Sequence, residues 1–151
     1  MKKYILCCMM VFLTVSTLKG QTVHIYSAPY IGKIFDYYRT QDNFTYINRY
    51  FKKDKHNPIP YRKYILTTKA DPDSELVKKL SEEVRYATKN SSFKLVETVQ
   101  KEGSMVEVYE YTHTRENKPP NKLIFSIIIN KEDRSKSEVS LILTTYYMSY
   151  K

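Results

Sequence analysis

The second half of the chain contains four runs of aromatic and β-branched residues, separated by short polar segments. The runs occupy residues 93–100, 105–114, 122–130 and 138–148. This composition is typical of β-strands. The connections are too short for the crossover that joins parallel strands, so successive strands should be antiparallel neighbours. The run 122–130 (KLIFSIIIN) is the most apolar, and we expect it in the middle of the sheet.

Two further strands are expected in the first half of the chain. Residues 43–51 (NFTYINRYF) and 61–68 (YRKYILTT) are rich in aromatic and β-branched residues. The segment 52–60 (KKDKHNPIP) should be a loop, because its prolines cannot donate to a strand ladder. A short strand over residues 22–30 is also predicted. The segment 115–121 (RENKPPN) should form a loop between two later strands.

The helices are expected at residues 31–41 and 71–90, where apolar residues recur at helical spacing. Leu80 lies at the centre of the apolar stripe of the second helix, and Asp71 is expected to cap its N-terminus. Neither helix can bury its stripe alone, so both should pack on one face of the sheet. The sequence therefore predicts an α+β fold with an antiparallel sheet of about five or six strands and two helices on one face.

Residues 1–20 have the pattern of a signal peptide. A short cationic start and an apolar run at 4–15 precede a more polar region that ends at Gly20. The run is shorter than the ~20 residues that a membrane-spanning helix needs. Cleavage after Gly20 would make Gln21 the new N-terminus. Cleavage after Ser16 and retention of the segment as an uncleaved anchor are the alternatives.

Both cysteines, Cys7 and Cys8, lie inside the apolar run, whereas a lipid-modified cysteine normally follows it. The mature chain 21–151 should therefore have neither lipid nor cysteine, which excludes disulfides and thiolate sites. Its length suits a single domain. Loss of three lysines and no acid lowers its net charge from +9 to +6. We expect a periplasmic or secreted protein with no transmembrane segment after cleavage.

Residues 49–64 (RYFKKDKHNPIPYRKY) interleave basic and aromatic side chains and contain a single acid, Asp54. Proteins that bind single-stranded nucleic acid use such a combination, but export would separate this chain from cytoplasmic nucleic acid, so no nucleic acid partner is expected. The simpler interpretation is charge that keeps a sheet edge soluble. The alternative is a site for an anionic envelope component. The residues of this predicted anion-binding patch are Lys52, Lys53, Lys55, Arg62 and Lys63.

The motifs FTYI (44–47) and FKLVETVQKEGSMVEVY (93–109) resemble those of an exported bacterial family, domain of unknown function 4252, known chiefly from Bacteroidetes. The resemblance extends over about residues 31–146, while the basic loop at 52–63 and Pro119–Pro120 depart from the family pattern. It implies a small exported α+β protein. Members often lie beside sigma-factor or anti-sigma genes, which implies a link to envelope stress or signalling. The family has no established activity, so it supplies no catalytic residue.

Catalytic and metal-binding signatures are not found in the sequence. The histidines, His24, His56 and His113, are far apart, and none has a second ligand at helical spacing. There is no nucleophile elbow and no glycine-rich phosphate loop. We therefore expect no cofactor or metal, and a non-enzymatic module that binds an envelope protein or an anionic envelope component through a tyrosine-rich sheet face or edge. A small hydrolase with a dispersed His/Asp/Ser site is the alternative.

Export can be tested at the N-terminus of the mature protein. We expect the protein isolated from the envelope fraction to begin at Gln21, because Gly20 is a small residue at the end of the polar region. N-terminal mass analysis measures this directly. A lipid-bearing start at Cys7 or Cys8 would contradict the prediction.

Overall fold

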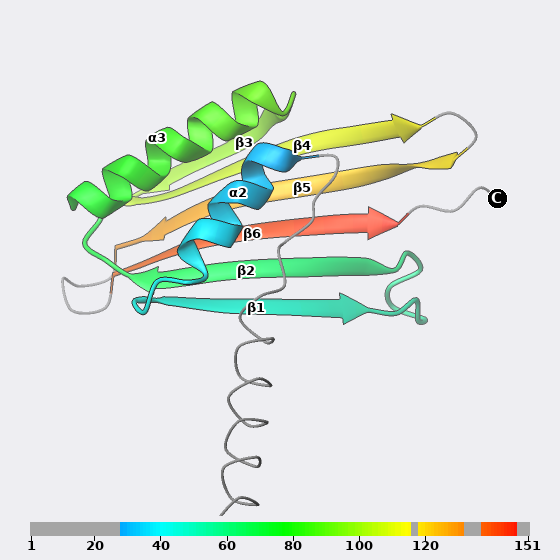
Figure 1. Ribbon diagram of the computed structural model, residues 1–151, viewed down its shortest axis with the longest axis horizontal. Coiled ribbons are helices and arrows are strands. Elements are labelled where there is room, and N and C mark those ends of the chain that lie inside the picture. Colours follow the sequence, from blue (N-terminus) through cyan, green and yellow to red (C-terminus); the bar gives the residue numbers. More distant parts are fainter. Residues whose placement is uncertain (1–27, 116–117, 132–136, 148–151) are drawn as a thin grey trace, which may run out of the picture.

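The structure, a computed structural model, describes residues 28–115, 118–131 and 137–147. It is an α+β fold in which a six-stranded, open antiparallel sheet carries both helices on one face (Figure 1). The helices are α2 (Pro29–Tyr38) and α3 (Glu75–Asn90). The strands are β1 (Phe44–Phe51), β2 (Tyr61–Lys69), β3 (Lys94–Lys101), β4 (Ser104–Arg115), β5 (Lys118–Asn130) and β6 (Glu138–Tyr147). This architecture confirms the predicted fold class.

The strands lie in the order β1-β2-β6-β5-β4-β3, and every neighbouring pair is antiparallel. The chain therefore builds one hairpin at each side of the sheet and inserts β6 between β2 and β5. The apolar strand β5 lies inside the sheet, as its composition predicts. One face of β5 is fully buried, through Leu123, Phe125, Ile127 and Ile129.

The core lies between the sheet and the two helices. The Phe35 ring of α2 meets the rings of Tyr46 and Tyr64, with centroids 6.5 and 6.3 Å apart. Figure 1 shows α3 over the β3–β4 side of the sheet, and its Leu80 is 1% exposed. The two helices also touch, because the Tyr30 ring packs edge-on against that of Tyr86 on α3, at 5.7 Å. Because Tyr46 on β1 and Tyr64 on β2 both contact Phe35 of α2, the even-numbered side chains of these two strands face the helices.

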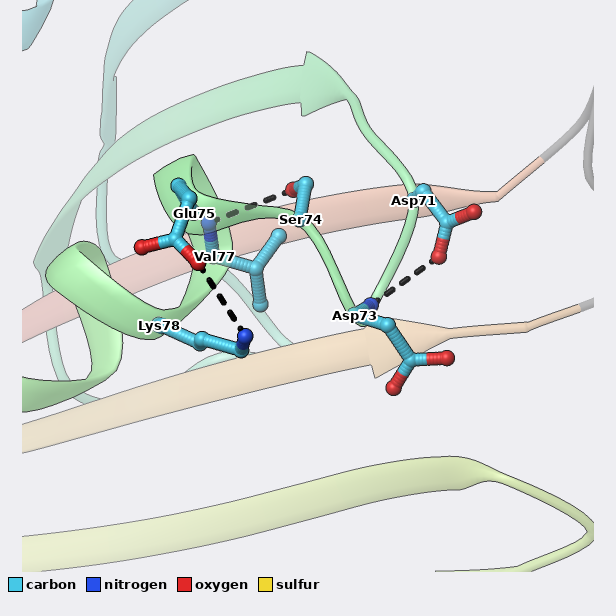
Figure 2. Close-up of polar contacts among 6 residues, drawn as sticks. All are labelled: Asp71, Asp73, Ser74, Glu75, Val77 and Lys78. Atoms are coloured by element: carbon cyan, nitrogen blue, oxygen red, sulfur yellow. Dashed lines mark hydrogen bonds and ion pairs between the residues drawn. The ribbon is translucent and has the colours of Figure 1, made fainter.

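The N-terminus of α3 differs from the prediction, which placed Asp71 at the cap. The N-cap is Ser74, whose Oγ accepts a hydrogen bond from the backbone N–H of Val77 at 3.4 Å (Figure 2). Asp71 instead accepts one from the backbone N–H of Asp73 at 2.9 Å, which closes the turn before the helix. Both residue types bind free backbone N–H groups, so composition alone does not decide between them.

Other boundaries also differ. Helix α2 spans Pro29–Tyr38 instead of 31–41, so the end of the predicted strand 22–30 is helical, and residues 22–27 lie outside the described part. The predicted loop at 115–121 is largely strand, since β5 begins at Lys118 and includes both prolines. A register shift near His113 accompanies them. Such irregularities are where strands tolerate proline.

The predicted signal segment, its cleavage site and both cysteines lie outside the described residues, and those predictions stay untested. Among the helices of residues 28–115, 118–131 and 137–147, none has the length and apolar character needed to cross a membrane.

The packing of α3 can be tested with Leu80→Ala. The Leu80 side chain is 1% exposed, so its truncation leaves a cavity and should lower the free energy of unfolding by about 2–5 kcal/mol. Urea denaturation measures the difference. Glu82→Ala, on the exposed side of the same helix, is the control and should change the value by less than about 0.5 kcal/mol. A loss that small for Leu80→Ala would mean that α3 does not pack on the sheet as described.

Candidate binding surface

The sheet face opposite the helices has aliphatic side chains where a solvent face usually has polar ones. On β2, Leu66 is buried against the helices, so Ile65 and Thr67 point to the other side. We call the side of the sheet opposite the helices the uncovered face. Its residues Ile47 and Val99 are 36% and 48% exposed. Its aliphatic residues, in the observed register, are Ile47, Ile65, Val99, Val106, Val108, Ile124, Ile128 and Ile142. Contiguous apolar surface of this kind is typical of interaction sites.

Three aromatic rings cross one end of the uncovered face, and we name Phe51, Tyr61 and Tyr146 the aromatic row. They are register partners on β1, β2 and β6. Phe51 and Tyr61 stack with centroids 4.6 Å apart and planes 13° apart. Tyr61 and Tyr146 follow at 5.5 Å. The three rings form a half-buried platform beside the aliphatic surface.

Two cations lie next to the aromatic row on the same face. The Lys63 ammonium is 5.9 Å from the centroid of the Tyr61 ring, and Arg49 is the register partner of Lys63 on β1. In the described part of the chain, no ion pair involves either of them. Further along, Lys122 is neutralised by Glu110 at 2.9 Å. Arg49 and Lys63 therefore form a pair of neighbouring cations beside the aromatic row.

Arg62 points to the other side of β2, because neighbouring strand residues alternate between faces. Its guanidinium lies 5.7 Å from the centroid of the Tyr50 ring, which in turn is 6.3 Å from the Tyr147 ring. Arg62 Nε is buried and has no hydrogen-bond partner in the described residues. Burial raises the pKa of the neighbouring Tyr64, and the positive charge of Arg62 partly offsets that rise. An unsatisfied buried donor is a candidate contact for an anion.

The loop between β1 and β2 is held by Asp54. Its Oδ1 accepts hydrogen bonds from the backbone N–H groups of His56 and Asn57, at 2.8 and 2.6 Å. These bonds lower the pKa of the Asp54 carboxyl. The one acid of the loop is thus engaged with the backbone of its own loop. Lys52, Lys53 and Lys55 are exposed around it, and no ion pair in the described residues involves them.

The structure divides the predicted anion-binding patch into three parts. Lys52, Lys53 and Lys55 lie on the loop, Lys63 on the uncovered face and Arg62 on the helix side of β2. All belong to one end of the β1–β2 hairpin, and anion binding by them stays a prediction. Sequence reasoning missed Tyr146, which joins the aromatic row only through the pairing of β6 with β2. Local sequence contains no signal for that pairing.

The described residues do not assemble the histidines into a site. His56 is exposed on the β1–β2 loop, while His24 and the side chain of His113 lie outside the description. Within the described ranges, no group of three or more His, Cys, Asp or Glu side chains is placed to hold a metal. Glu107 and Glu110 point to opposite faces, with Glu107 accepting a hydrogen bond from the Tyr109 hydroxyl at 2.7 Å.

No family model, curated protein or solved structure matches the chain. The resemblance to the exported bacterial family therefore rests on the motifs in the sequence alone. What the surface binds has to be inferred from its own chemistry.

The role of Asp54 can be tested by NMR titration of its carboxyl. Hydrogen bonds to the ionised form lower its pKa, so the midpoint should lie below the ordinary value of 3.8. Because the folded pKa is the lower one, the loop is stabilised above 3.8 and loses that contribution as the pH falls through the folded pKa. Asp54→Ala should shift the amide resonances of His56 and Asn57 at neutral pH. A midpoint at or above 3.8 would contradict the described loop.

Proposed function

We propose that the protein is an exported, non-enzymatic binding module that recognises phosphate-bearing lipid of the bacterial envelope. The observation that carries this proposal is the set of cations around the aromatic row that have no acidic partner among the described residues. Arg49 and Lys63 lie beside the row, and the loop lysines follow directly after β1. Asp54, the one acid of the loop, is bonded to its own backbone. Uncompensated positive charge of this kind attracts anionic surfaces.

The aromatic row distinguishes a lipid from a simple anion. Tyrosine has an apolar ring and a polar tip, and such residues are favoured at the boundary between headgroups and acyl chains. Lysine and arginine near that boundary pair with anionic headgroups. The aliphatic residues of the uncovered face continue from the row toward the middle of the sheet. The surface thus offers cations for a phosphate, rings for the interface and aliphatic contacts for the adjoining chain.

A link to envelope stress or sigma-factor signalling is part of the proposal and is supported by the sequence resemblance alone. Export, on which the proposal depends, is supported by the signal pattern at residues 1–20. The alternative of a small hydrolase has no specific observation in its favour among the described side chains, since the described histidine, His56, is exposed on a loop.

Vesicle binding tests the proposal. The full chain, expressed with its signal segment and purified after export, should cosediment with vesicles that contain anionic phospholipid and not with vesicles of zwitterionic lipid alone. Binding should fall as salt is raised, because exposed charges are screened over about 10 Å at 0.1 M ionic strength. The simultaneous change of Lys52, Lys53 and Lys55 to Ser should abolish binding at moderate salt. Circular dichroism should show an unchanged fold, since these side chains are exposed.

A matched control removes the same charge elsewhere. Lys33, Lys78 and Lys89 are exposed on the helix layer, and their joint change to Ser should leave most of the binding intact. Vesicles that contain lipopolysaccharide are tested in parallel, so that binding to lipopolysaccharide is distinguished from binding to anionic phospholipid. Equal loss in both triple variants would indicate attraction by net charge alone and would refute a site at the hairpin. Retention of the wild type on an acidic polysaccharide without lipid, and not on vesicles, would refute lipid as the ligand.

A further inference from the structure

Strand β3 is an edge strand with apolar side chains exposed along its length. Leu95, Val96 and Val99 are 54%, 57% and 48% exposed, and every residue of β3 is exposed. Exposed apolar edges tend to pair with another strand unless charge prevents it. The opposite edge, β1, carries Arg49 in mid-strand and runs into the lysine loop. The β3 edge has lysines at its two ends and one acid, Glu97, between them.

The β3–β4 hairpin determines which backbone groups of β3 remain free. Lys101 and Ser104 flank a two-residue loop, in which Glu102 and Gly103 have φ of 51° and 83°. These angles match a type I′ turn, whose flanking residues exchange both hydrogen bonds. Bonding then alternates, so residues 97, 99 and 101 bond to β4. Thr98 and Gln100 direct their N–H and C=O groups away from the sheet.

We propose that β3 pairs with β3 of a second copy of this chain, in an antiparallel register centred on Val99. Thr98 then exchanges backbone hydrogen bonds with Gln100 of the partner subunit, using the groups that point away from the sheet. Val99 meets its own symmetry mate as a non-hydrogen-bonded pair, with Cα atoms about 4.5 Å apart. Glu97 lies opposite Lys101 of the partner subunit. The two-fold symmetry repeats that ion pair on the other side of Val99.

Charge and backbone geometry select this register over its neighbours. A shift by one residue would place the outward-pointing backbone groups of one β3 strand opposite groups of the second copy that already bond to its own β4. A shift by two toward the N-terminus would set Glu97 opposite Val99 and run the ladder into the irregularity between Leu95 and Glu97. Within their own chain, Glu97 and Lys101 have the uncharged register partners Val108 and Ser104. Neither takes part in an ion pair among the described residues, so both charges remain for the second copy.

The pairing would join two six-stranded sheets edge to edge and continue the uncovered face across both copies. Val99 and its register partner Val106 would then lie near the centre of the combined apolar surface. This inference does not depend on lipid binding, since the β1–β2 hairpin with its lysine-rich loop lies at the opposite edge of the sheet. The two proposals can therefore fail separately.

Charge reversal across the interface tests the pairing. Sedimentation equilibrium of the exported full chain should give twice the mass of one chain at high protein concentration. Glu97→Lys and Lys101→Glu should each raise the dimer dissociation constant by about tenfold or more, because each replaces two attractions by two repulsions. The double variant, with both reversals, restores opposite charges and should return the constant to near the wild-type value.

Controls distinguish pairing at β3 from association through another surface. Thr45→Lys, an added charge on the β1 edge, should leave the mass unchanged, and circular dichroism should show that all variants are folded. A wild type that is monomeric at the highest concentration would overturn the proposal. A dimer whose dissociation is unaffected by either single reversal would also overturn it, because the contact would then lie elsewhere. If the double variant is folded but its dimer dissociation constant does not return toward the wild-type value, the proposed register is wrong.

Discussion

The one-sided burial of the sheet is the constraint on which the rest of the structure depends. Both described helices lie on the same face, where Phe35 packs against Tyr64 of β2 and Leu80 is 1% exposed. The burial of such side chains is the main favourable term in folding. Neither described helix covers the opposite face, although that face carries isoleucine and valine on most strands. Packing of the helices thus accounts for the apolar side chains of one face of the sheet, and the proposed binding function would account for those of the other.

Element type was well predicted from the sequence because composition and period agree over most segments. The strands and the helix α3 were placed to within a few residues, and β5 was assigned to the interior from its apolar run. Errors arose where two local interactions compete for the same role. Asp71 and Ser74 can both bind free N–H groups, and their roles follow from the path of the turn. Pro119 and Pro120 indicated a loop, but the register shift near His113 lets the strand accommodate them.

The candidate surface was only partly predictable, because its members meet through long-range pairing. The basic and aromatic stretch 49–64 was visible as a contiguous run, and the hairpin does bring its two ends together. Tyr146 belongs to the same row only because the last strand inserts between β2 and β5. Such an insertion depends on contacts far apart in sequence, so no local pattern reports it. The exposed apolar edge of β3 likewise became visible only once the strand order was known.

Register decides the chemistry of both faces of the β1–β2 hairpin. Tyr61 and Tyr64 are the same residue type in one strand, yet Tyr61 lies in the aromatic row, whereas Tyr64 is buried against α2 and its pKa is raised. A shift of one residue would exchange the two faces of a strand. It would move Tyr61 out of the aromatic row, place Arg62 on the uncovered face and bring Lys63 under the helix, where an ammonium without a partner is costly to bury. The core thereby selects the register that leaves Lys63 on the uncovered face, and the need to bury Tyr64 and Leu66 determines which cation a ligand on that face would meet.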